Sequence, residues 1–178
     1  MRNKLEIFNA QIVYSNFEGL EKKDKNTGRI VNDKGNRNFN VILDPEKSEI
    51  YWNGELQTDP DFGQTLYELG WNVKIKPGIE EGEPAQYKLP VAVSYKNPSM
   101  IPDLNIVVNG KPKPLFEDTV GTLDGTEISS ADIEINNGKT YIDSSTGKER
   151  VKAWCNKGFF NVIPSRLDQR YRYQQEED

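Results

Sequence analysis

The stretch VKAWCNKGFFNVI, residues 151–163, alternates apolar and polar side chains, as a β-strand does because its successive side chains point to opposite faces. Val151, Ala153 and Cys155 share one face, which leaves Lys152 and Trp154 on the other. The alternation breaks at residues 156–158, Asn-Lys-Gly, where a tight hairpin between two strands is predicted. The stretch therefore indicates β structure with a tryptophan between lysines on its polar face.

The rest of the chain carries further short alternating segments, separated by Gly, Pro, Asn and Asp; they span residues 5–14, 38–44, 71–76, 87–96, 104–108, 125–128 and 132–135. The segment DFGQTLYELG, residues 61–70, has apolar side chains at helical spacing and ends in glycine, so it is the best helix candidate. Residues 18–36 are predicted to form a long flexible loop. This pattern favours a mainly β fold, an OB-fold-like five-stranded Greek-key barrel with long loops and one short helix. We expect one domain over residues 1–173 and a short acidic tail over residues 174–178.

Composition excludes several classes of enzyme. The chain has 178 residues, one cysteine and no histidine, so nucleophile–histidine pairs and histidine metal ligands are absent. Cys155 lies in register with apolar neighbours and is predicted to be a buried thiol. No glycine-rich phosphate-binding motif occurs, and no apolar run reaches the roughly 18 residues that cross a membrane. We expect a cytoplasmic protein that is not an enzyme and needs no cofactor or metal.

Carboxylates offer one catalytic alternative. Asp118, Asp124, Asp132 and Glu134 could hold magnesium in a nuclease. However, Asp132 and Glu134 alternate with Ile133 and Ile135. This pattern is typical of a strand with one solvent-exposed face and one buried face. The solvated strand face is the simpler interpretation of these acids.

The charge pattern points to a polyanion despite the net charge of −5. Residues 87–116 hold 4 basic residues and 1 acidic residue, and residues 139–173 hold 8 basic and 3 acidic ones. Aromatic residues are interleaved with these basic residues, a combination that suits single-stranded nucleic acid, because cations follow the backbone and rings stack on bases. The predicted phosphate contacts are Arg37, Lys74, Lys76, Lys88, Lys96, Arg150, Lys152 and Lys157.

The predicted stacking platforms are Trp154, Phe39 and Phe159, with Tyr95, Trp52 and Trp71 as further candidates, although the core is the favoured location for Trp71. Phe39 could equally lie in the core with Val41 and Leu43, because the three residues share a strand face. Trp71, Tyr87 and Phe160 share faces with aliphatic residues and are predicted core residues.

The spaced segments NRNFNVILDPE, GWNVKIKPG, YKLPVAVSYKNPSMIPDL, LDGTEISSADIEI and VKAWCNKGFFNVI resemble those of phage-encoded single-stranded DNA-binding proteins of the OB-fold class. The resemblance spans most of residues 37–163. It implies sequence-tolerant binding of single strands in phage replication or recombination, without a cofactor, in the host cytoplasm. In such proteins an acidic tail commonly docks replication or recombination proteins, and a homodimer is compatible with the sequence.

A second class of function fits the same observations. A β-rich structural or assembly protein of a virion would also lack histidine and cofactor motifs, and its aromatic and charged strand faces would contact other subunits. A large defined oligomer without salt-sensitive affinity for DNA would identify it.

Overall fold

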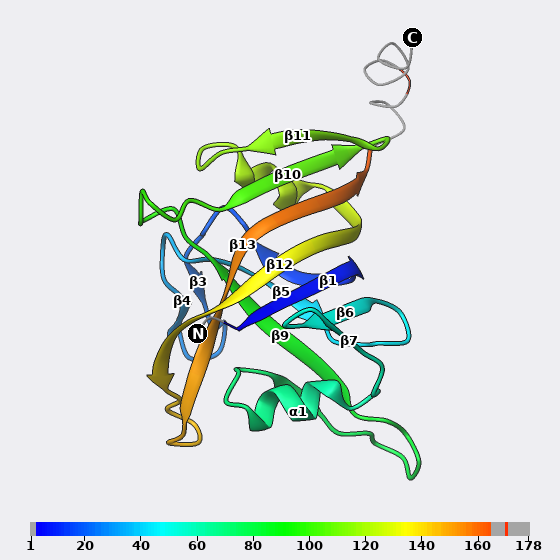
Figure 1. Ribbon diagram of the computed structural model, residues 1–178. Coiled ribbons are helices and arrows are strands. Elements are labelled where there is room, and N and C mark those ends of the chain that lie inside the picture. The colour runs from blue at the N-terminus through cyan, green and yellow to red at the C-terminus, as the bar shows by residue number, and fades with distance from the viewer. Residues whose placement is uncertain (1–2, 165–169, 171–178) are drawn as a thin grey trace.

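The computed structural model describes residues 3–164 and residue 170. These residues form one large sheet, a separate two-stranded sheet and a short helix (Figure 1). In chain order the elements are β1 Lys4–Ala10, β2 Ile12–Asn16, β3 Lys22–Lys23, β4 Ile30–Asn32, β5 Arg37–Ile42, β6 Glu49–Trp52, β7 Glu55–Gln57, α1 Phe62–Glu68, β8 Lys74–Lys76, β9 Gln86–Val93, β10 Asp103–Val108, β11 Lys111–Leu115, the 3₁₀ helix η1 Val120–Gly125, β12 Glu127–Ile142 and β13 Glu149–Ile163.

Five long strands form an OB-fold-like barrel. The hydrogen-bonded path runs β2–β5–β9–β13–β12–β1. Because only Gln11 separates β1 from β2, the two ends of this path belong to one bent strand. β9 and β13 run parallel, whereas the other neighbours along this path are antiparallel. This arrangement confirms the predicted mainly β, OB-fold-like architecture.

The bend between β1 and β2 has a local cause. The β1–β12 register shifts between Ile7 and Ala10, and Asn9 has a positive φ of 59°. Extra residues on one strand increase its bend and twist. The bulge therefore lets one segment of chain pair with β12 on one side of the barrel and with β5 on the other.

β13 is one continuous strand of 15 residues, so the predicted hairpin at residues 156–158 is wrong. Its pairing with β12 passes from Glu134↔Lys157 to Ile135↔Cys155, which leaves Asn156 as an extra, bulged residue. The bulge accounts for the break in alternation, and it keeps Trp154 and Lys157 on the same, outward side. The segments 125–128 and 132–135 were expected as separate strands, but Glu127, Ile128 and residues 132–135 belong to the single strand β12.

The barrel interior is filled by aromatic and aliphatic side chains. Phe17, Phe39 and Phe160 pack against one another with ring centroids 5.2–5.7 Å apart. Trp71 is buried beside Trp52, at 5.4 Å. The predicted core residues Trp71, Tyr87 and Phe160 are confirmed as buried.

The predicted helix is confirmed as α1, Phe62–Glu68, which buries Phe62 and Leu66. Residues 18–36 were expected to be a loop without strands, but they contain the β3–β4 hairpin, which pairs only with itself. The acidic tail at residues 174–178 lies outside the described residues. No helix in the described part of the chain has the length and apolar character needed to cross a membrane.

Candidate nucleic-acid interface

Neighbouring strands of the large sheet, β2, β5, β9, β8 and β13, present polar side chains on one outward face of the barrel. Asn38 of β5 lies opposite Ala92 of β9, and Ala92 lies beside Trp154 of β13. The inward neighbours on the same strands are buried apolar residues such as Phe39 and Val91. We call this outward surface, which carries Tyr14, Asn38, Asn40, Lys74, Lys88, Lys152 and Trp154, the basic face.

Lysines of this face form no ion pairs in the part of the chain that the structure describes, although the charge of Lys74 adds to the hydrogen bonds from Ser145 that lower the pKa of the Asp143 carboxyl. Lys74 of β8 lies directly opposite Lys88 of β9, a pairing of like charges that destabilises a sheet. Among the described residues, no carboxylate oxygen lies within 4.0 Å of the Nζ of Lys74, Lys88 or Lys152. An anion bound at this face would relieve the repulsion between the lysines.

Trp154 is held in place by a glycine of the neighbouring strand. The indole lies against Gly138 of β12, where a Cβ atom would collide with the Nε1 and Cδ1 atoms of the ring. Lys152 Nζ lies 5.0 Å from the centroid of the same ring. The ring remains half-buried, so it is both oriented and accessible at the surface. A fixed aromatic ring beside a cation is a suitable platform for a nucleobase.

Tyr14 is a residue of this face that the sequence did not reveal. It is 76% exposed and has a positive φ of 49°, an uncommon conformation for an aromatic residue. Lys88 Nζ lies 4.6 Å from its ring centroid, and Asn40 Nδ2 donates to its carbonyl oxygen at 3.3 Å. Only the pairing of β2, β5 and β9 brings Tyr14 and Lys88 together, so no local sequence signal marks the pair.

The structure brings four of the predicted site residues, Lys74, Lys88, Lys152 and Trp154, to the basic face. Lys76 follows Lys74 by two residues on β8 and is exposed, so it extends this face. Lys96 is exposed in the loop after β9.

Two predicted contacts are wrong, because their side chains are buried. Phe39 is 0% exposed and stacks on Phe17 inside the barrel, with centroids 5.4 Å apart. Arg150 is 6% exposed, donates to the carbonyl oxygen of Tyr67 at 2.6 Å and covers the Tyr67 ring at 3.7 Å. Its guanidinium thus fastens β13 to helix α1 and does not face a ligand.

Three other predicted residues are engaged elsewhere in the fold. Arg37 donates to the carbonyl oxygen of Phe17 at 2.7 Å and lies 5.6 Å from the ring of Tyr95. Burial of Tyr95 raises its pKa to about 12, since the charged phenolate is disfavoured away from water. Trp52 packs between Trp71 and Phe62 at the end of the barrel near α1. Their main contacts are therefore structural.

Lys157 and Phe159 point outward from the second half of β13, where their neighbours are acidic. Lys157 lies opposite Glu134, and Phe159 lies opposite Asp132. Lys4, 2.9 Å away, lowers the pKa of Glu134 by stabilising its carboxylate. These two predicted contacts therefore lie farther along β13 than the basic face, beside carboxylates of β12.

The four carboxylates of the nuclease alternative are not gathered into a metal site. Asp124 accepts the backbone N–H groups of Phe17 and Glu18, each at 2.9 Å, and Asp132 accepts the N–H of Asn9 at 2.9 Å. Within residues 3–164 and 170, no three His, Cys, Asp or Glu side chains are close enough to hold a metal ion. These acids support loops and strand ends.

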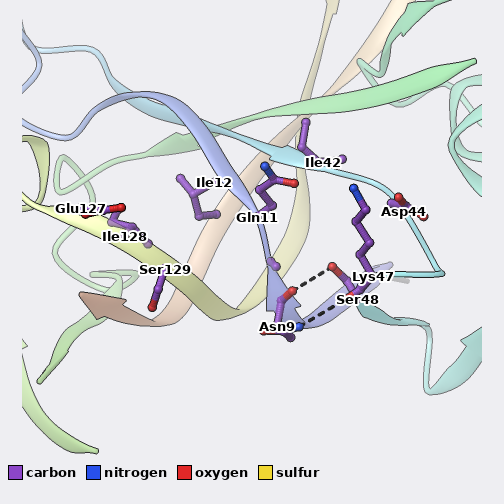
Figure 2. Close-up of a pocket in the computed structure, with 11 residues that line it drawn as sticks. Asn9, Gln11, Ile12, Ile42, Asp44, Lys47, Ser48, Glu127, Ile128 and Ser129 are labelled. Carbon is purple, nitrogen blue, oxygen red and sulfur yellow. Dashed lines mark hydrogen bonds between the residues drawn. The ribbon is translucent and has the colours of Figure 1, made fainter. Parts of the chain in front are cut away.

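A polar hollow of about 370 Å³ lies at the bend between β1 and β2 (Figure 2). Two hydrogen bonds join residues that line the hollow. Ser48 Oγ donates to the carbonyl oxygen of Asn9 at 2.9 Å, and Asn9 Nδ2 donates to the carbonyl oxygen of Lys47 at 3.2 Å. These groups satisfy one another and stabilise the bulge at Asn9. The hollow is therefore part of the barrel bend.

Cys155 is buried, as predicted from its register. Burial raises the pKa of its thiol to about 12, because the thiolate would lie in apolar surroundings. The thiol is inert at neutral pH.

The comparison with protein families agrees with this geometry. Residues 1–177 match the family described as "Putative phage ssDNA-binding domain". The chain belongs to this family. The resemblance drawn from the spaced sequence segments is thereby confirmed over nearly the whole chain.

Among solved structures, the chain is similar to the single-stranded DNA-binding protein from bacteriophage Enc34 in complex with ssDNA. The two share 7% sequence identity with a TM-score of 0.44, and the match covers 91% of this chain and 88% of that one. No curated protein matches the sequence.

Proposed function

We propose that this member of the phage ssDNA-binding family binds single-stranded DNA along the basic face, without catalysis and without a cofactor. The observation that carries the proposal is the lysine pair Lys74 and Lys88, which lie opposite each other on the same face as Lys152 and form no ion pair with a carboxylate of the described residues. The phosphates of a bound strand would relieve this repulsion and release their own counterions.

The aromatic side chains of the face would bind the bases. Trp154 and Tyr14 each carry a lysine against the ring, at 5.0 Å and 4.6 Å, so one unit of the face offers a stacking surface and a phosphate contact together. Stacking contributes roughly 1–3 kcal/mol per base and tolerates any sequence, because every base has a π-face. We therefore propose sequence-tolerant binding, which suits a role in phage DNA replication or recombination in the host cytoplasm.

The acidic tail has a separate role in this proposal. Residues 176–178, Glu-Glu-Asp, end the chain after the basic and aromatic segment RLDQRYRY. An acidic terminus attracts basic surfaces of other proteins, so replication or recombination proteins are its proposed partners. Deleting residues 174–178 should then remove binding of such a protein and leave the basic face intact.

The test of DNA binding uses tryptophan fluorescence. Titration with an oligothymidine of about 30 nucleotides at two salt concentrations should quench the emission of half-buried Trp154, more strongly at low salt. Duplex DNA is the control ligand. Trp154→Phe should remove most of the quenching, whereas Trp52 and Trp71, packed at the barrel end, should report little.

Matched lysine variants locate the site. Lys88→Ala should weaken binding and reduce the slope of the logarithm of the binding constant against the logarithm of the salt concentration by about 1. Lys113→Ala on β11 should change neither the affinity nor this slope. No fluorescence change and no salt-sensitive affinity at low salt would contradict the proposal. A large oligomer under the same conditions would favour the virion structural protein instead.

A further inference from the structure

The β3–β4 hairpin exposes apolar side chains that the barrel does not cover. Its two strands form a sheet of their own, and Leu20, Ile30 and Val31 are 53%, 46% and 65% exposed. A two-stranded hairpin has little stability alone, and packing against another surface stabilises it. The uncovered apolar side chains indicate that a partner surface completes this sheet.

The hairpin is nevertheless firmly mounted. Asn32 Nδ2 donates to the carbonyl oxygen of Leu20 at 2.8 Å, and Asn38 Nδ2 of β5 donates to Asn32 Oδ1 at 3.1 Å. At the tip, Asp24 Oδ1 accepts the N–H of Asn26 at 2.7 Å. The exposed residues are therefore presented in a defined shape. The basic residues of the hairpin segment, all exposed, are Lys22, Lys23, Lys25, Arg29 and Lys34.

A surface of opposite charge lies across β1, β6 and β7. Glu6, Tyr51 and Leu56 form one cross-strand row on the outward side, and Phe8 lies opposite Glu49 in the next row. We call these five residues the acidic-aromatic patch. Phe8 and Leu56 are 42% and 53% exposed, and the rings of Phe8 and Tyr51 meet edge to face at 5.8 Å. Exposed apolar groups rimmed by charge are typical of interaction sites.

The acids of this patch stay available to a partner. Glu49 accepts a hydrogen bond from the Tyr51 hydroxyl at 3.3 Å and forms no ion pair within the described residues. The negative charge of Glu49 raises the pKa of Tyr51. Glu6 lies 3.8 Å from Lys4, whose shorter contact, 2.9 Å, is with Glu134. The patch thus keeps negative charge around an apolar centre.

The hairpin and the patch are complementary and lie on different sides of the barrel. Figure 1 shows β3 and β4 at the left of the barrel and β6 and β7 at the right. Each surface exposes apolar side chains. Basic residues outnumber acidic ones on the hairpin, although Lys23 lies 3.7 Å from Glu21, and acidic residues predominate on the patch. Two different surfaces that fit each other join copies head to tail, and such contacts continue as an open row.

We propose that the β3–β4 hairpin of one copy docks on the acidic-aromatic patch of the next copy, so that adjacent copies bind single-stranded DNA cooperatively. This inference rests on the proposed function, because the strand brings the copies together. Both surfaces are small, so the contact is weak in free solution. On one strand, neighbouring copies reach effective concentrations of about millimolar, at which a weak contact stabilises the row.

The experiment uses the full chain and two DNA lengths: an oligothymidine that holds one copy, and long poly(dT). Lys22→Glu with Lys23→Glu should lower the cooperativity on poly(dT) by roughly tenfold, and Glu6→Lys with Glu49→Lys should do the same. Combining the four changes should restore cooperativity, because the charges again match. Glu117→Lys with Asp118→Lys, on an exposed turn outside the patch, is the matched control.

A second variant does not depend on charge. Leu56→Ser removes an exposed apolar group of the patch and should also lower cooperativity, with an unchanged melting temperature. Affinity for the short oligothymidine should stay unchanged in all patch variants. An equal loss of affinity for short and long DNA in the hairpin variants would overturn the inference, since the hairpin would then contact DNA. A failure of the combined variant to restore cooperativity would also overturn it. Failure of the proposed function would instead appear as no binding of the wild type to the short oligothymidine.

Discussion

The two outward sides of the barrel carry opposite chemistry, although strands of one sheet build both. On the basic face, Lys74 and Lys88 lie opposite each other, and neither forms an ion pair among the described residues. On the β1–β12 side, Glu134 lies between a lysine of each neighbouring strand, paired with Lys4 at 2.9 Å and opposite Lys157. On the β1–β12 side, acidic and basic side chains of the protein pair with one another. On the basic face, the lysines have no such ion pairs within the described chain and can interact with a bound anion.

This difference explains how an acidic protein can bind a polyanion. The net charge of −5 sums over all sides, but electrostatic attraction acts mainly within about one Debye length, ~8–10 Å at moderate salt. A strand on the basic face therefore meets lysines first, while the acids on the far side repel it weakly. The acids also discourage DNA from binding at the wrong face.

The largest expected effect comes from Gly138→Ala, which tests whether the placement of Trp154 makes the basic face functional. The new Cβ would occupy the position of the indole, so the ring must move away. We expect single-stranded DNA affinity to fall by about tenfold or more, as the stacking energy of roughly 1–3 kcal/mol implies. Gly125→Ala, where a Cβ meets nothing within 4 Å, is the matched control in the same titration.

A smaller effect with opposite signs separates the two faces. Lys74→Gln should raise the free energy of unfolding by up to about 0.5 kcal/mol, because it removes a like-charge pair, and should weaken DNA binding. Lys4→Gln should lower stability slightly and leave DNA binding unchanged, since it removes an ion pair of the β1–β12 side. Urea unfolding and DNA titration of both variants measure this. A lower free energy of unfolding for Lys74→Gln would contradict the destabilising repulsion between Lys74 and Lys88.

The smallest expected effect is a pH dependence confined to the β1–β12 side. The pKa of Glu134 is lowered from 4.5, first by its hydrogen bond with Lys4. The folded protein therefore holds this proton less tightly than the unfolded chain, so the contribution is present above pH 4.5 and is lost as pH falls through the lowered pKa. Glu134→Gln should flatten stability against pH in this range. Thermal melts between pH 3 and 6, about the ordinary range of carboxyl titration, would show it, and an unchanged slope would contradict it.

Sequence reasoning identified the parts of the site that depend on one strand. Lys152 and Trp154 share a face because alternation within a strand is fixed, and the structure keeps them together on the basic face. The same reasoning misassigned Arg150, whose outward position by alternation is covered by Tyr67 of α1. Phe39 was ambiguous for a related reason, since alternation shows that it shares a face with Val41 but does not show which face is inside.

The sequence by itself therefore determined the mainly β class, the single short helix, the buried Cys155, Trp71, Tyr87 and Phe160, and the pairing of lysine with tryptophan on β13. The tertiary structure alone decided that Tyr14 meets Lys88, that Gly138 seats Trp154, and that Lys157 and Phe159 lie beside acids. The physical reason is that alternation is a local property of one strand. The neighbours of a side chain across strands depend on register and bulges, which long-range pairing sets.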